Sequence, residues 1–306
     1  MKIGFCGLGR MGMNMVRRIQ QGGADPALRG GESVVAWNRS PAKRDELLAT
    51  GAEWAESLEV LVAALQPPRA IWLMVPAESV DEMLAQLAPL CAPGDILIDG
   101  GNSRHIDSAR RAGELSAQGL RFMDVGTSGG IWGLTVGYCL MVGGEPETFQ
   151  LLEPIFKALA PPDGYLHCGP SGAGHFVKMV HNGIEYGMMQ AYAEGFDIMQ
   201  AAPYGIDLPA VAHLWNQGSV VRSWLLELGE SALAKDPGLA TVGPRVDDSG
   251  EGRWTVHDAV DLGVPAPVIT LSLFARFSSR DENSFANRML AVLRREFGGH
   301  AVEEQK

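Results

Sequence analysis

Cysteine and long apolar runs are both scarce in this chain of 306 residues. The four cysteines are Cys6, Cys91, Cys139 and Cys168, and none of them forms a CxxC or zinc-ligand spacing. We therefore expect reduced thiols in the core, no disulfide framework and no bound metal. No window approaches the roughly 20 apolar residues that a membrane span needs. No charged and apolar leader precedes the first strand-like run, so we expect a cytoplasmic protein without a membrane partner.

Positive charge is also in short supply. The chain has 25 lysines and arginines against 36 aspartates and glutamates, which gives a net charge of -11 and a pI near 5.1. A nucleic acid or an anionic membrane would need a basic face, so we expect neither as a partner. Any anion must be held by a few local groups. The length allows two domains, each with its own core.

The chain opens with a pattern that is typical of nucleotide binding. A short apolar run at residues 3–6 is followed by a GxGxxG sequence and then by a helical stretch. In this motif Gly7 makes the turn, Gly9 admits a pyrophosphate to the backbone, and Gly12 packs the helix on the strand. The candidate cofactor contacts are Gly7, Leu8, Gly9, Arg10, Met11 and Gly12.

The order of strands and helices predicts two kinds of domain. Strands are expected at 34–37, 70–75, 95–98 and 122–125, with helices between them at 40–50 and 79–90. This alternation predicts an α/β fold with a doubly wound parallel sheet of Rossmann type. Only helices are expected afterwards, at 173–201, 208–217, 220–233, 254–262, 268–277 and 284–297. We expect a dinucleotide-binding domain over 1–170 and an all-helical substrate and dimerisation domain over 171–306.

The residues that follow the expected strand at 34–37 bear on the choice between NADP and NAD. An acidic residue there would hold a ribose 2'-hydroxyl and repel a 2'-phosphate. This chain has Asn38, Arg39 and Ser40, which can all donate hydrogen bonds to a phosphate. They favour NADP. The alternative is that Asn38 binds only the ribose and Arg39 only stacks on adenine, as it would with NAD.

Two glycine-bearing loops follow later strands, at residues 99–103 and 126–130. Open α/β sheets bind their ligands at such strand ends. Asn102 in the first loop and Ser128 in the second are short donors and acceptors beside accessible backbone amides, suited to a hydroxylated anionic substrate. The alternative is that each residue serves only its own turn.

The expected helix at 173–201 has an unusual polar face. At about 100° per residue, Lys178, Asn182 and Glu185 project within roughly 40° of one direction, and His181 lies about 60° away. An apolar stripe lies about 120° from them; it comprises Val177, Val180, Ile184, Met188 and Ala191. This polar set is small and chemically mixed, which favours an active-site wall over a solvated surface.

Several of these motifs together resemble one family. They are GLGRMG at Gly7, DGGNS at Asp99, GTSGG at Gly126, YCLMVGG at Tyr138, GHFVKMVHNGIEYG at Gly174, FAR at Phe274 and FGGH at Phe297. The chain resembles the decarboxylating 6-phosphogluconate dehydrogenases nearly end to end, in their short form with one helical unit. The resemblance implies oxidation of 6-phosphogluconate to ribulose 5-phosphate and carbon dioxide in the pentose phosphate pathway, with NADP or NAD as hydride acceptor.

The resemblance also implies roles for single residues. Lys178 would be the general base and acid, and Glu185 the acid that protonates carbon. The implied substrate contacts are Asn102, Ser128, Gly129, Gly130, His181 and Asn182. The implied phosphate contacts are Tyr186, Arg276, Arg294 and His300, the last two reaching over from a partner subunit of a homo-oligomer, a dimer or tetramer. Judged by residue type alone, Arg276, Arg294 and His300 could equally be surface charges.

Three positions depart from the long forms of the family. Val75, which with Asn102 would lie beside the cofactor, stands where long forms carry a lysine, and this weakens the case for NADP. Ser249 replaces a phosphate-binding lysine. Asn38, in contrast, favours NADP, because short forms that use NAD often carry an acidic residue at this position.

Two other functions remain open at this point. Another β-hydroxyacid dehydrogenase would share the glycine loop and Lys178 but would not need Glu185 or the phosphate cations. A non-catalytic dinucleotide sensor would use the same helix face as a partner surface.

Overall fold

A computed structural model describes residues 1–22, 33–298 and 301 of the chain. It forms two compact units, Met1–Asn182 and Gly183–Lys306. The boundary falls within one long helix, α8 (Ala173–Ala201), which therefore contributes residues to both units.

The first unit is built on an eight-stranded sheet with the order β3-β2-β1-β4-β5-β6-β7-β8. Its strands are β1 (Lys2–Cys6), β2 (Ser33–Trp37), β3 (Glu53–Trp54), β4 (Ala70–Leu73), β5 (Ile96–Asp99), β6 (Arg121–Ser128), β7 (Cys139–Gly144) and β8 (Tyr165–Gly169). All neighbouring pairs are parallel except β6 and β7. The chain order reverses between β1 and β4, which is where such sheets open a ligand crevice. The predicted α/β, doubly wound Rossmann-type fold is confirmed.

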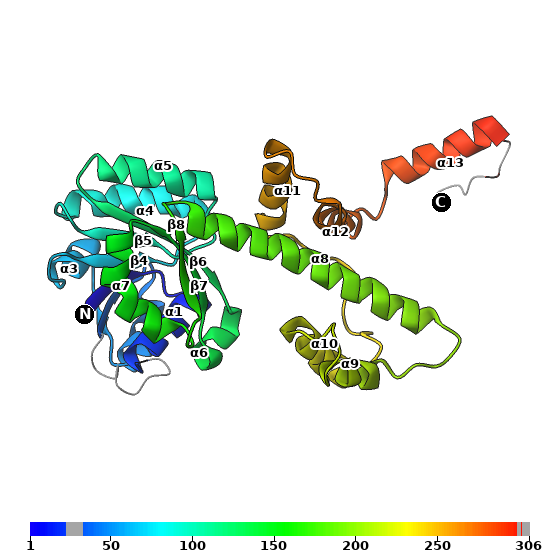
Figure 1. The fold of residues 1–306 in the computed structure, drawn as a ribbon, viewed down its shortest axis with the longest axis horizontal. Coiled ribbons are helices and arrows are strands. Elements are labelled where there is room, and N and C mark those ends of the chain that lie inside the picture. Colours follow the sequence, from blue (N-terminus) through cyan, green and yellow to red (C-terminus); the bar gives the residue numbers. More distant parts are fainter. Residues whose placement is uncertain (23–32, 299–300, 302–306) are drawn as a thin grey trace. The chain divides into compact units, whose positions relative to one another are not determined.

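Helices cover both faces of this sheet (Figure 1). They are α1 (Arg10–Gln20), α2 (Arg44–Leu48), α3 (Leu58–Ala63), α4 (Val80–Leu87), α5 (His105–Ser116), α6 (Gly133–Val136) and α7 (Pro146–Leu159), with 3₁₀ turns η2 (Pro41–Lys43), η3 (Ala77–Ser79), η4 (Ala88–Leu90) and η5 (Gly130–Trp132). The apolar side chains of α1 and α7 share one core with one face of the sheet. Those of α3, α4 and α5 share a second core with the other face.

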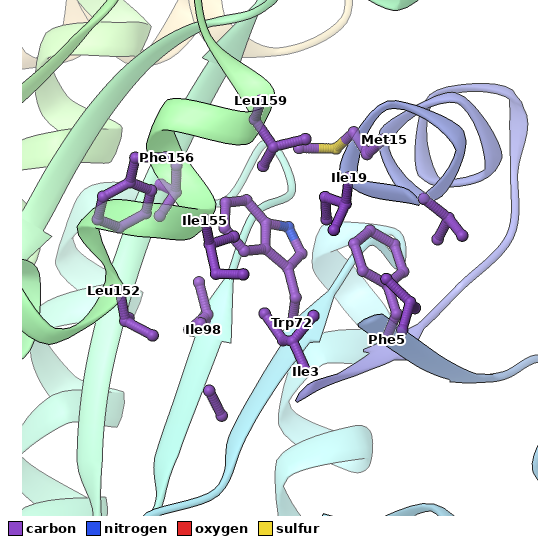
Figure 2. Packing of buried hydrophobic residues seen from close by; sticks show 14 of the residues in the cluster. Ile3, Phe5, Met15, Ile19, Trp72, Ile98, Leu152, Ile155, Phe156 and Leu159 are labelled. Carbon is purple, nitrogen blue, oxygen red and sulfur yellow. The ribbon is translucent and has the colours of Figure 1, made fainter. Parts of the chain in front are cut away.

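Trp72 lies at the centre of the first core (Figure 2). Its ring stacks on Phe5 with centroids 6.4 Å apart and meets Phe156 of α7 edge-on at 6.3 Å. Such aromatic pairs bury large apolar areas and fix ring orientation. The tryptophan thereby joins β1 and β4, the two strands at the crevice, to a covering helix.

The second unit contains only helices among its described residues. Besides the end of α8 they are α9 (Leu208–Asn216), α10 (Trp224–Lys235), α11 (Glu251–Asp261), α12 (Pro267–Ser278) and α13 (Phe285–Gly298). Side-chain caps start three of them: Asp207 accepts from the amide of Ala210, Ser223 from that of Leu226, and Ser284 from that of Asn287. The helical class of this part is confirmed.

The sequence did not predict three strands and misplaced one loop. β3, β7 and β8 were not expected. β6 continues to Ser128 because β7 runs antiparallel beside it and pairs Ser128 with Cys139; residues 126–128 are therefore strand rather than loop. The expectation of core thiols was also wrong in part, since Cys6 is buried but Cys139 is exposed at the start of β7.

Candidate active site

The glycine loop has the shape that a dinucleotide requires. A Cβ on Gly7, whose φ is 100°, would lie 2.4 Å from the carbonyl oxygen of Met74, and a Cβ on Gly12 would lie 2.1 Å from that of Gly7. At Gly9, in contrast, a Cβ would meet nothing within 4 Å. The space above Gly9 is open, and α1 begins at the next residue with no acidic side chain in its first turn. A pyrophosphate therefore fits at this helix N-terminus.

Asn38 supports this loop from the end of β2. Its Oδ1 accepts from the amide of Leu8 at 2.9 Å, and its Nδ2 donates to the carbonyl of Ser40 at 2.9 Å. The side chain thus ties the glycine turn to the turn after β2. Arg39 and Ser40 are exposed beside it, and Val75 approaches Gly7 from the end of β4. The structure brings these candidate cofactor residues together.

Asp99 organises the loop that carries Asn102. Its Oδ2 accepts from the hydroxyl of Ser103 at 2.6 Å and from Nη1 of Arg111 at 3.1 Å, and its Oδ1 accepts from the amide of Gly101 at 3.1 Å. Asp99 is fully buried, whereas Asn102 is exposed. Asp99 thus holds the loop from its buried side, and Asn102 lies on the exposed side.

The first turns of α8 lie directly on β6. A Cβ on Gly126 would come within 2.3 Å of Cβ of Lys178. Lys178 is 7% exposed, and its Nζ donates to Oδ1 of Asn182 at 2.5 Å. His181 places Nδ1 at 2.9 Å from the same oxygen and Nε2 at 3.4 Å from Oγ of Ser128. Four of the predicted substrate and catalytic residues thus form one hydrogen-bonded group.

These contacts assign the proton on His181. Oδ1 of Asn182 is an acceptor, so Nδ1 of His181 carries the hydrogen that points to it. Nε2 is then the acceptor for the hydroxyl of Ser128. Oδ1 of Asn182 therefore accepts from both Lys178 and His181.

Beyond Ser128 the backbone turns through two glycines with positive φ, 123° at Gly129 and 51° at Gly130. A Cβ on Gly130 would meet nothing within 4 Å. The space where a side chain of residue 130 would stand is therefore open.

On α8 part of the predicted polar face is buried and part of the predicted apolar stripe is exposed. Lys178 and Asn182 are buried, while Val177, Ile184 and Met188 are exposed. This distribution is the reverse of an ordinary surface helix. It excludes the interpretation of the polar face as merely solvated.

In the second unit, Tyr186, Ser249 and Arg276 come together. The guanidinium carbon of Arg276 lies 3.5 Å from the ring centroid of Tyr186, and the hydroxyl of Tyr186 accepts from the amide of Ser249 at 3.1 Å. A Cβ on Gly252 would lie 2.5 Å from the ring of Tyr186. This close approach explains why residue 252 is a glycine.

Neighbouring charges hold the loop that contains Ser249. Asp248 accepts from Arg253 at 2.6 Å and from Arg280 at 2.8 Å. Hydrogen bonding by Arg253, followed by that of Arg280, lowers the pKa of Asp248 to about 2. The carboxylate is therefore ionised at neutral pH and holds the loop to α11 and to the turn that follows α12.

Other predicted residues belong to the second unit or lie outside the described residues. Glu185 is partly buried on α8, and Arg294 is exposed on α13. His300 lies outside the described residues. Within the described ranges, no group of His, Cys, Asp and Glu is arranged to hold a metal, and no helix is long and apolar enough to cross a membrane.

An open dinucleotide loop and a buried lysine group at the same edge of the sheet define a nicotinamide-dependent dehydrogenase. Two family models match the chain: the NAD-binding domain of 6-phosphogluconate dehydrogenase over residues 2–169, and the C-terminal domain of 6-phosphogluconate dehydrogenase over 174–303. The chain belongs to the 6-phosphogluconate dehydrogenase family.

Individual relatives agree with this assignment. The NAD(+)-dependent, decarboxylating 6-phosphogluconate dehydrogenase of Haloferax volcanii is 44% identical, over 99% of this chain and 98% of its own. The solved 6-phosphogluconate dehydrogenase of Plasmodium falciparum matches with a TM-score of 0.83 and 27% identity, over 100% of this chain and 67% of its own. A 3-hydroxyisobutyrate dehydrogenase from Salmonella typhimurium, with a TM-score of 0.73 and 23% identity over 92% of this chain and 95% of its own, shares the fold.

The contact between Gly126 and Lys178 generates a first prediction. Gly126→Ala should lower kcat on the order of 100-fold, because the added methyl forces Lys178 away from the sheet. Gly113→Ala is the matched control, since a Cβ there on α5 meets nothing within 4 Å. Steady-state nicotinamide reduction measures both. Equal kcat values for the two variants would contradict this role of the contact.

Proposed function

We propose that the protein catalyses oxidative decarboxylation of 6-phosphogluconate to ribulose 5-phosphate and carbon dioxide, with NADP or NAD as the hydride acceptor. The group formed by Lys178, Asn182, His181 and Ser128 carries this proposal. It lies at the edge of a dinucleotide-binding sheet, on a helix that also bears Glu185. The match to both family models supports it.

Oxidation is the first step. When bound, the nicotinamide would supply the acceptor for the hydride of C3 of the substrate. Lys178, in its neutral form, donates one N–H to Asn182 and uses its lone pair to remove the proton of the 3-hydroxyl. Ser128, held by His181, binds a substrate oxygen nearby. The product of this step is a 3-keto acid.

Decarboxylation follows, because a carboxylate β to a ketone loses carbon dioxide readily. The ammonium of Lys178 donates to the keto oxygen while the enolate forms. Glu185 then protonates C1 of the enediol to give ribulose 5-phosphate. Glu185 lies seven residues after Lys178 on α8, about 10.5 Å along the axis at 1.5 Å per residue, so the two groups can serve different carbons.

In this proposal Tyr186 and Arg276 bind the phosphate end of the substrate. Ser249 supplies a hydroxyl where long forms have a lysine, and its loop is already anchored by Tyr186 and Asp248. Arg294 and His300 would be contributed by a partner subunit. We place the enzyme in the cytoplasm, in keeping with its unpaired cysteines.

Two variants separate the chemical steps. Lys178→Met should lower nicotinamide reduction with 6-phosphogluconate on the order of 1,000-fold, because general base catalysis is lost. Glu185→Gln should form the enediol but slow its protonation, so carbon dioxide release should outpace ribulose 5-phosphate formation. Single-turnover assays of reduced nicotinamide, carbon dioxide and the pentose phosphate distinguish these steps.

The same assay tests the two rivals. Turnover of 3-hydroxyisobutyrate but not of 6-phosphogluconate by the wild type would identify another β-hydroxyacid dehydrogenase. Nucleotide binding without any turnover would identify a sensor. Full activity in Lys178→Met would reject the proposed base.

Cofactor preference depends on Arg39 in this proposal, since both polar groups of the Asn38 amide are already bonded within the protein. Arg39→Ala should raise KM for NADP about 10- to 100-fold, because one charge-assisted contact to the 2'-phosphate is lost, and should change KM for NAD little. Arg44→Ala is the matched control, because Arg44 is bonded to Glu56 on the same surface. Equal effects on both cofactors would contradict a phosphate contact.

We also propose a homo-oligomer, because the described part of the second unit exposes more large apolar side chains than the longer first unit. Ile198 on α8 and Leu271 on α12 are 71% and 65% exposed. Ile198→Glu combined with Leu271→Glu should reduce the sedimentation mass toward that of a 32.8 kDa chain. Ile106→Glu on α5 is the control, and a wild type that sediments as a monomer would refute the proposal.

A further inference from the structure

Every second residue of β6 meets a successive turn of α8. Asp124 contacts the start of the helix, Gly126 packs against Lys178, and Ser128 lies beside His181. Alternate strand positions project from one face of a sheet, and helix positions three apart share one face. Strand and helix are therefore aligned residue by residue, and a shift of one against the other moves Lys178 relative to Ser128.

Asp124 fixes one end of this alignment. It is fully buried, and its two carboxylate oxygens accept from two different amides: Oδ1 from Gly172 at 2.6 Å and Oδ2 from His175 at 2.9 Å. These amides belong to the first turn of α8, where backbone donors have no partner within the helix and the dipole favours a negative charge. A strand side chain thus caps the helix that carries the active lysine.

The surrounding backbone leaves no room for this cap to move. A Cβ on Gly143, the ladder partner of Asp124 on β7, would lie 2.5 Å from Oδ1. A Cβ on Gly174 would lie 2.6 Å from the carbonyl oxygen of Asp124 and 2.4 Å from that of Met141. Gly143 therefore leaves room for the carboxylate, and Gly174 lets α8 touch both strands.

Contacts with α5 also hold the first turn of α8. His175 places Nδ1 at 2.7 Å from the hydroxyl of Ser108 on α5, and a Cβ on Gly172 would lie 2.9 Å from the carbonyl oxygen of His105. The helix start can neither rotate nor slide without breaking bonds to β6 and α5.

We propose that Asp124 is a positioning residue for the dehydrogenase reaction: it sets the register of α8 on β6 and so places Lys178 and His181 against Ser128. This inference rests on the proposed function. Asp124 itself touches neither substrate nor cofactor in it, and acts through the helix alone.

Asp124→Asn tests the proposal, because the amide keeps the shape but replaces one acceptor oxygen with a donor that faces a backbone N–H. We expect kcat to fall about 10- to 100-fold through misplacement of Lys178, KM for the nicotinamide cofactor to stay within about twofold, and hydrogen exchange of residues 172–178 to become faster. Exchange is read by mass spectrometry on the full chain.

Asp95→Asn is the matched control. Asp95 is equally buried, accepts from the amides of Arg69 and Ala92 and from Nη1 of Arg69, and has no bond to α8. We expect a similar loss of thermal stability with kcat unchanged and exchange in α8 unchanged. An equal loss of kcat in both variants, or a loss in Asp124→Asn without faster exchange, overturns the proposal.

Asp124→Glu separates register from charge. It keeps the carboxylate but adds one methylene to the connection between strand and helix, so kcat should remain at least about 10-fold low. Wild-type kcat in this variant would show that the charge alone matters and would overturn the proposal. Absence of turnover in the wild type would reject the proposed function instead, while the exchange measurements still test the register.

Discussion

The close approach of α8 to β6 is the constraint on which the site depends. It is possible only because Gly126 has no side chain, so that Cβ of Lys178 can occupy the space where one would stand. The contact removes Lys178 from water and brings it within reach of Asn182. A lysine on a solvent-facing helix keeps its hydration shell, whereas one pressed against a sheet must replace it with contacts to protein groups.

The same constraint explains the inverted polarity of α8. Burying Lys178 and Asn182 is tolerable because they hydrogen-bond to each other, and the apolar stripe that would normally seek the core is left outside. Ile184 and Met188 are exposed as a result. The burial of Lys178 on one side of the helix and the exposure of apolar side chains on the other are two consequences of one packing arrangement.

Much of this architecture could be predicted from the sequence because it depends on local patterns. Gly7, Gly9 and Gly12 mark a turn of fixed geometry, and α8 was predicted with its observed bounds because its period is strong over many residues. The antiparallel pairing of β7 was not predictable, since it is decided by contacts between strands. The bond from Asn38 to Leu8 and the cap by Asp124 link residues 30 and 48 or more positions apart, and no local pattern reveals such pairs. The role proposed for Glu185 came from the resemblance to a known family. The geometry within one unit does not indicate that role.

The reversal of β7 has a consequence for the segment between residues 129 and 138. In a parallel sheet the chain would have to cross back before the next strand, through a long connection. Here the chain returns through η5 and α6, and both ends of the segment are fastened to the same ladder, where Ser128 pairs with Cys139. A segment tied at both ends in this way has fewer conformations open to it than a free loop of the same length. An insertion or deletion in it would disturb two adjoining strands together, so its length is constrained as firmly as its composition.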